Sequence, residues 1–139
     1  MTYEEIYRSK LMSAEDAVES QVKSGDKIAI GGLALADKVL KAVISDVKAG
    51  RLEDISLFGN LITSDIGLND EDIPKDKFRY YAFFNGGYER AGAANGIVTN
   101  VPLHLSRFED YFTFVDPDVA IVPMTPPDEH GYCNIGPAG

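Results

Sequence analysis

The sequence is poor in residues that cross-link a chain or bind metal: one cysteine and two histidines among 139 residues. One cysteine cannot form an internal disulfide, so a reducing cytoplasm is the expected compartment. Basic residues are also few, since 13 lysines and arginines face 22 aspartates and glutamates, for a net charge of −9. This balance argues against nucleic acid and anionic membrane surfaces as partners, because both attract clustered Lys and Arg.

Long apolar runs are missing as well. The first residues, MTYEEIYRSK, contain no apolar core of a secretory signal, and no stretch approaches the length of a membrane span. Internal repeats and low-complexity segments are absent from the sequence. What remains is ordinary for a globular fold, with 45% hydrophobic and 25% charged residues, and the length fits a single domain.

Apolar periodicity predicts helices alternating with strands. Helices are expected over residues 13–25, 37–50 and 106–112, with a short helical stretch inside 85–96. Strands are expected over 27–30, 55–63 with a break near Gly59, 78–84, 97–102 and 119–124. The last of these strands is uniformly apolar, which predicts that both of its faces are covered. The alternation predicts an α/β fold, an open and mostly parallel sheet with helices on its faces.

Two helix starts have capping signals. Ser13 is followed three residues later by Asp16, and Ser106 is followed three residues later by Glu109. This spacing is that of the capping box, so both serines are predicted to be N-caps.

Small and polar residues follow four of the predicted strands. They are Gly31 and Gly32, then Gly59 and Asn60, then Asn85, Gly86 and Gly87, and finally Thr125, Pro126 and Pro127. Ligands of open α/β sheets bind beyond the carboxyl ends of the strands, so these loops form the candidate ligand edge. The glycines at 31 and 32 equally suit a plain strand-to-helix turn, and they form neither a GxGxxG nor a Walker loop.

The segment TPPDEHGYCNIGPAG holds the residues with the most reactive side chains. A metal site at Asp128, Glu129, His130 and Cys133 is disfavoured, because consecutive ligands rarely converge on one ion and no paired ligand spacing exists. A Cys133–His130 nucleophile pair has equally thin support, since catalytic partners are recognised by spatial geometry. Cys133 is instead expected to fill apolar space, and His104 to be a hydrogen-bonded structural histidine.

Three segments resemble a known family in their order and separation: SAEDAV…SGDKIAIGG, VPLHLS, and DVAIVPMTPPDEHGY. Together they resemble the N-terminal half of the acetyl-CoA hydrolase/transferase family, which includes acetate, butyrate and 4-hydroxybutyrate CoA-transferases. PPDEHGY is the most specific piece. The sequence departs from the family pattern in GGLALADK, at Thr125, where serine is common, and in ANGIVTN, which lacks a frequent basic residue. These departures affect the prediction of the substrate more than the assignment of the sequence to the family.

The resemblance implies covalent chemistry on an acyl-CoA. Family members attack the thioester with a glutamate and pass through an acyl-glutamyl anhydride and a glutamyl-CoA thioester before CoA goes to a second carboxylate. That glutamate belongs to the C-terminal half of the family's fold, so no residue here is predicted to be catalytic, and Glu129 is not the nucleophile. The implied partners are an acyl-CoA, a short-chain carboxylate and the C-terminal catalytic half. No cofactor is bound permanently, because the coenzyme A thioester is a substrate.

Residues 1–139 are therefore expected to be one domain, the N-terminal half of a CoA-transferase-like protein, from a truncated or split chain that is inactive alone. Acetyl-CoA hydrolase on the same scaffold and a non-catalytic binding or assembly module remain alternatives. The predicted substrate- and CoA-binding residues are Gly31, Gly32, Asn60, Asn85, Gly86, Thr125, Pro126, Pro127, Glu129, His130 and Gly131; no metal ligand is predicted.

Two further expectations concern surfaces. Apolar surface left by a missing half predicts a homo-oligomer, most simply a two-fold dimer. The segment after Met124 is expected to leave the sheet at the ligand edge, extended by Pro126 and Pro127, with Asp128, Glu129 and His130 supporting the loop. Its last residues are expected to be poorly ordered or held by a neighbouring copy.

Overall fold

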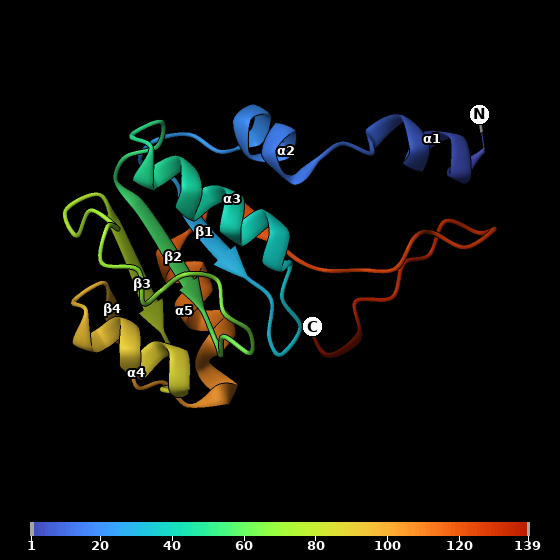
Figure 1. Ribbon diagram of the computed structural model, residues 1–139. Helices are drawn as coiled ribbons and strands as arrows, with labels where there is room; N and C mark the ends of the chain where they lie inside the picture. The colour runs from blue at the N-terminus through green and yellow to red at the C-terminus, as the bar shows by residue number, and fades with distance from the viewer. Residues whose placement is uncertain (1, 139) are drawn as a thin grey trace.

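The computed structural model describes residues 2–138 and is built around a five-stranded sheet (Figure 1). The strands lie in the order β4-β3-β2-β1-β5, and all four pairings are parallel. The strands are β1 (Lys27–Ile30), β2 (Ile55–Gly59), β3 (Phe78–Ala82), β4 (Val98–Asn100) and β5 (Val119–Ile121). The predicted α/β fold with an open parallel sheet is confirmed.

Helices cover both faces of this sheet. The described helices are α1 (Tyr3–Lys10), which lies off the sheet, and α2 (Ala14–Gln21), α3 (Asp37–Lys48), α4 (Gly87–Ala94) and α5 (Phe108–Val115), with 3-10 turns η1 (Leu105–Arg107) and η2 (Gly136–Ala138). In Figure 1, α3 and α4 lie in front of the sheet and α5 lies behind it. Among residues 2–138, no helix has the length and apolar character needed to cross a bilayer.

The two faces of the sheet have separate apolar cores. Leu57 and Tyr80 point to the face covered by α3 and pack with its buried stripe, Leu40, Val43, Ile44 and Val47. Phe58, one residue along β2, points to the opposite face and packs beneath α5. Successive side chains of a strand alternate between faces, so a buried run such as ISLF supplies both cores.

Aromatic side chains fill the core beneath α5. The ring of Phe83 lies 4.8 Å from Phe108, 5.1 Å from Tyr111 and 5.5 Å from Phe112, measured between ring centroids. These pairs are tilted or edge-on, the arrangement that aromatic quadrupoles favour. The aromatic side chains of the helix predicted over residues 106–112 are thus what attaches α5 to the sheet.

The capping predictions had different outcomes. The Ser13 hydroxyl oxygen accepts from the Asp16 N–H at 3.0 Å, as expected for the N-cap of α2. The prediction for Ser106 is wrong. The chain enters α5 through η1, where the His104 Nδ1 accepts from the Ser106 N–H at 3.3 Å, and α5 then begins without a side-chain cap. A 3-10 turn placed before the helix displaces the serine from the cap position.

The last strand also differs from its prediction. β5 ends at Ile121 rather than Met124, pairs only with β1, and leaves Ala120 exposed, so it is an edge strand rather than one covered on both faces. Pro123 explains the early end, because proline cannot donate to a strand ladder.

Replacing Ile28 by Ala tests the central role of β1. Ile28 is fully buried, so the loss of its side chain leaves a cavity, and we expect the free energy of unfolding to fall by about 2–5 kcal/mol. Urea denaturation measures this change. The control is Lys38→Ala on exposed α3 surface, expected within about 0.5 kcal/mol of the parent. Equal losses in both variants would contradict the described core.

Candidate functional site

Parallel pairing brings the carboxyl ends of the strands to one edge. Gly31 and Gly32 follow β1, Asn60 follows β2, and Asn85 and Gly86 follow β3. The Gly31 N–H donates to the Ile121 carbonyl at 3.2 Å, which extends the β1–β5 pairing past the end of β1. Five of the predicted site residues therefore share this edge, as the topology requires.

Two helices begin at the same edge with their first N–H groups uncapped. Ala36 is the N-cap of α3 and Gly86 the N-cap of α4, and neither makes a side-chain capping bond. Uncapped N–H groups and the positive end of the helix dipole attract anions. The edge thus combines backbone donors with small residues that let a ligand come close.

A buried glutamate lies under this edge. Glu89, in the first turn of α4, has 0% exposed surface, and its Oε1 accepts from the Ile62 N–H at 2.5 Å. Its Oε2 is buried without a hydrogen-bond partner among the described residues. The bond ties the start of α4 to the loop after β2. Glu89 is not among the residues predicted from the sequence, although a glutamate three residues after Gly86 has the spacing of a capping-box acid.

Gly86 is needed for this arrangement. A Cβ at position 86 would lie 2.5 Å from the Leu61 Cδ1 and 2.7 Å from the Glu89 Oε2. Both distances are below those that real Cβ atoms adopt, so any side chain would displace the loop or the carboxylate.

A tyrosine supports the same loop from within the sheet. The Tyr80 hydroxyl donates to the Asn60 carbonyl oxygen at 3.2 Å. Burial, and secondarily the charge of Glu89, raises the pKa of Tyr80 far above its usual range, so the phenol remains a neutral donor. The side-chain oxygens of Asn60 and Ser64 are buried without a partner in the part of the chain that the structure describes.

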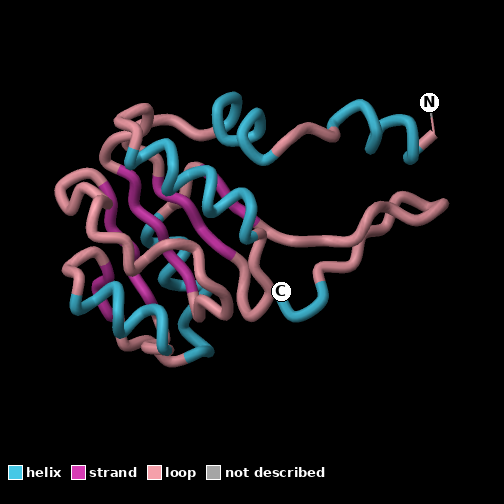
Figure 2. The backbone as a smooth tube through the Cα atoms, in the orientation of Figure 1, coloured by secondary structure: helices cyan, strands magenta, loops and turns pink. Residues whose placement is uncertain are grey.

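The segment after β5 leaves the edge and returns to it. It runs out in extended form and folds back as a narrow loop, closed by the Thr125 N–H to the Asn134 carbonyl at 2.9 Å (Figure 2). The Leu33 N–H then donates to the Pro137 carbonyl at 3.1 Å, beside the loop after β1. Pro137 thus has a hydrogen bond within its own chain; Gly139 lies outside the described residues.

The loop places the remaining predicted site residues away from Gly31 and Gly32. Figure 1 shows it lying beside α1, and the side chains of both segments line one shared hollow. The structure therefore divides the predicted site into two groups. The group at the carboxyl edge of the sheet comprises Gly31, Gly32, Asn60, Asn85 and Gly86. The group beside α1 comprises Thr125, Pro126, Pro127, Glu129, His130 and Gly131.

Asp128 and Gly131 form the turn at the tip of this loop. The Asp128 Oδ1 accepts from the N–H groups of His130 and Tyr132, both at 2.9 Å, and its carbonyl accepts from Gly131 at 3.0 Å. Gly131 has a φ of 85°, and a Cβ there would lie 2.8 Å from the Tyr3 ring. The DEHG segment is therefore a structural turn that packs on α1.

The other reactive side chains of the loop are exposed. The His130 Nε2 lies 3.6 Å from the Glu129 Oε1. Cys133 is also exposed, so its predicted role as an apolar filler is wrong. The filler prediction failed because the loop leaves the core before residue 133. Across residues 2–138, no cluster of three or more His, Cys, Asp or Glu is placed to hold a metal ion.

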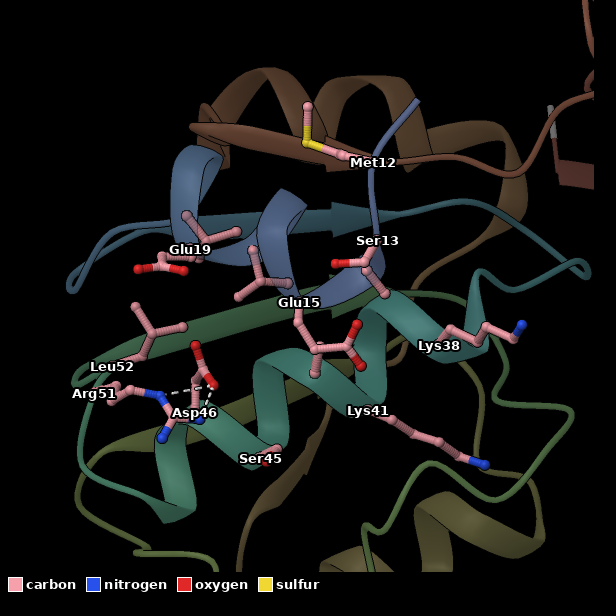
Figure 3. Close-up of a pocket in the computed structure, with 14 residues that line it drawn as sticks. Met12, Ser13, Glu15, Glu19, Lys38, Lys41, Ser45, Asp46, Arg51 and Leu52 are labelled. Atoms are coloured by element: carbon pink, nitrogen blue, oxygen red, sulfur yellow. Dashed lines mark hydrogen bonds and ion pairs between the residues drawn. The ribbon is translucent and has the colours of Figure 1, made fainter. Parts of the chain in front are cut away.

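A separate groove lies between α2 and α3. Its lining includes Lys38, Lys41 and the Asp46–Arg51 ion pair of 2.5 Å (Figure 3). None of the predicted site residues lines it, and its charges are mixed. The groove is therefore distinct from the carboxyl edge, and we assign it no ligand.

Comparison with known proteins identifies the family of the chain. Residues 1–138 match the family model described as the acetyl-CoA hydrolase/transferase N-terminal domain. The chain belongs to the acetyl-CoA hydrolase/transferase family, as this N-terminal domain. The resemblance carried by PPDEHGY is thereby confirmed.

Relatives within the acetyl-CoA hydrolase/transferase family include named CoA-transferases. The chain is 31% identical over 99% of its length to butyryl-CoA:acetate CoA-transferase of Anaerostipes caccae, covering 31% of that protein. It is 31% identical over 93% of its length to a succinyl-CoA:acetate/propanoyl-CoA:succinate CoA transferase of Fasciola hepatica, covering 27% of it. The chain thus spans about a third of the length of these relatives.

A solved structure shares the fold. RipA from Yersinia pestis superposes with a TM-score of 0.76 and 23% identity, over 98% of this chain and 34% of that one. This likeness supports the architecture of the domain.

Substitution of Glu89 tests the buried link between α4 and the loop after β2. Glu89→Ala leaves the Ile62 N–H buried without an acceptor, so we expect a loss of about 1–3 kcal/mol in unfolding free energy. Glu89→Gln keeps an acceptor at the same place and is expected to cost less. Urea denaturation compares the two variants. A Glu89→Ala variant as stable as the parent would show that this bond contributes nothing.

Replacing Gly131 by Ala tests the contact between the turn and α1. The added Cβ meets the Tyr3 ring, so we expect shifted Tyr3 ring resonances and faster amide exchange in α1. Gly136→Ala is the matched control, because Gly136 also has a positive φ of 53° but open space around its Cβ position. NMR of both variants makes the comparison. Unchanged Tyr3 resonances in Gly131→Ala would rule out the contact.

Proposed function

We propose that the chain is the N-terminal domain of a CoA-transferase that moves CoA between an acyl-CoA and a short-chain carboxylate. The observation that carries this proposal is the 31% identity over 99% of the chain to butyryl-CoA:acetate CoA-transferase. The family also includes hydrolases by its description, so acetyl-CoA hydrolysis, with water in place of the acceptor carboxylate, is the alternative. A non-catalytic assembly module is the third candidate.

The proposed reaction requires the complete protein, with its N-terminal and C-terminal halves. A glutamate carboxylate in the C-terminal half attacks the thioester carbonyl, and CoA leaves as a thiolate, giving an acyl-glutamyl anhydride. The thiolate then attacks the glutamyl carbonyl and releases the first carboxylate, which leaves a glutamyl-CoA thioester. The second carboxylate takes the CoA by the reverse sequence, so bonds and charge balance without any permanently bound cofactor.

In this scheme the carboxyl edge forms one wall of the substrate site. The residues that would lie along the acyl-CoA are Gly31, Gly32, Asn60, Asn85 and Gly86. The uncapped N-termini of α3 and α4 suit the anionic groups of the acyl-CoA. The predicted site residues on the loop after β5 would reach the same ligand only if the C-terminal half closes over that loop. They are Thr125, Pro126, Pro127, Glu129, His130 and Gly131.

The proposal extends to location and assembly. The complete protein is proposed to act in the cytoplasm, in keeping with the single cysteine and acidic charge of residues 1–139, as a homo-oligomer that is most simply a two-fold dimer. Sedimentation of the complete protein tests the second point, and a strict monomer at high concentration would contradict it.

The isolated chain should be inactive. Because the nucleophile is assigned to the other half, residues 1–139 alone should show no transfer of CoA from butyryl-CoA to acetate above a buffer blank. Mass-spectrometric detection of acetyl-CoA measures this. Turnover proportional to protein and lost in Glu129→Gln would contradict the assignment and make Glu129 catalytic.

A chimera tests the function directly. In it, this chain replaces the matching N-terminal third of the Anaerostipes caccae transferase. We expect acetyl-CoA to form from butyryl-CoA and acetate, and little free CoA to form when acetate is left out. Free CoA released at the same rate without acetate would favour the hydrolase, and a folded chimera without either activity would favour the assembly module.

A further inference from the structure

The first and last parts of the chain together form an arm. We define the arm as residues 2–12 and 122–135, that is α1 with its connection to α2 and the loop after β5. In Figure 1 these two segments run side by side away from the sheet, and they share a hollow lined by Tyr7, Leu11, Pro126 and Pro127 among others. α1 has no buried residue, so nothing in the described domain covers its outer side.

Most of the exposed large apolar side chains lie on this arm. They are Tyr3, Ile6, Leu11, Met12, Met124, Tyr132 and Ile135, with Leu11 59% and Tyr132 74% exposed. Single exposed apolar residues are common on protein surfaces, but a group of this size on a protruding segment marks an interaction surface.

We propose that the arm is the docking surface for the C-terminal region that follows this domain in CoA-transferases of the family. This inference rests on the proposed function, because it assumes that such a region accompanies the domain. The arm would then lie between the two regions, with its apolar side chains forming part of their shared core.

The course of the chain favours this occupant. The relatives are about three times as long as the matched part, and the family model describes that part as the N-terminal domain, so a large region remains to be placed after it. The Leu33–Pro137 bond brings the chain back to the base of the arm, beside the loop after β1. A region continuing from that point starts next to the arm, and covalent attachment gives it a high effective concentration there.

Charge disfavours the competing occupant, a second copy of this chain. The chain has a net charge of −9, and two such domains repel one another on close approach. The arm itself offers Glu4, Glu5, Asp128 and Glu129 against Arg8 and Lys10. A partner that brings basic side chains to this rim fits the arm better than an identical acidic surface.

The test is amide hydrogen exchange on the isolated chain and on the Anaerostipes caccae chimera described above. We expect amides of residues 2–12 and 122–135 to exchange about tenfold or more slowly in the chimera than in the isolated chain. Ile6→Asp with Leu11→Asp should abolish most of that protection. Both residues are exposed in the isolated domain, so its own fold should survive the change.

Phe114→Asp is the matched control. Phe114 is 83% exposed but lies on α5, away from the arm, so the arm should remain protected in its chimera. Arm amides that exchange equally fast in chimera and isolated chain would overturn the proposal. A dimer of the isolated chain that dissociates in the Ile6→Asp, Leu11→Asp variant would overturn it too, by assigning the arm to a second copy.

The activity of the same chimera separates this inference from the proposed function. An active chimera whose arm is unprotected would refute the docking surface and leave the transferase function standing. A protected arm in a folded, inactive chimera would support the docking surface and refute the function.

Discussion

Parallel pairing at the centre of the sheet is the constraint on which the rest of the molecule depends. β1 and β2 lie between other strands, so both of their faces must be covered, and helices cross over to cover them. The same pairing directs the carboxyl end of every strand to one edge. Burial of the strands and placement of the candidate site are therefore consequences of a single arrangement.

The candidate edge is held by polar groups that are themselves buried. Glu89 binds the backbone of Ile62, and Tyr80 binds the carbonyl of Asn60, so the loop after β2 is held from α4 and from β3. Buried polar groups are costly unless they are paired, and paired ones fix a loop more firmly than apolar packing alone. A rigid loop at this place suits the substrate wall that we propose for this edge.

The loop after β5 is held differently from the carboxyl edge, mainly by hydrogen bonds within the loop itself. Its tip is defined by its own hydrogen bonds around Asp128 and by the contact between Gly131 and Tyr3, while most residues of positions 124–135 are exposed in the described structure. Segments with few buried contacts open at a lower free energy than the core. Such a loop suits an element that is shaped in advance and completed by the C-terminal region that we propose docks on it.

The sequence by itself determined the class of fold and the family. The alternation of helices and apolar strands predicted the parallel sheet, and PPDEHGY indicated the acetyl-CoA hydrolase/transferase family, because both signals lie in contiguous residues. Tertiary structure alone decided the strand order, the short edge strand β5, the burial of Glu89 and the position of the DEHG turn beside α1. Each depends on contacts between residues far apart in the chain. Local spacing predicts which residues follow a strand, but where a long loop comes to rest is determined by what it packs against.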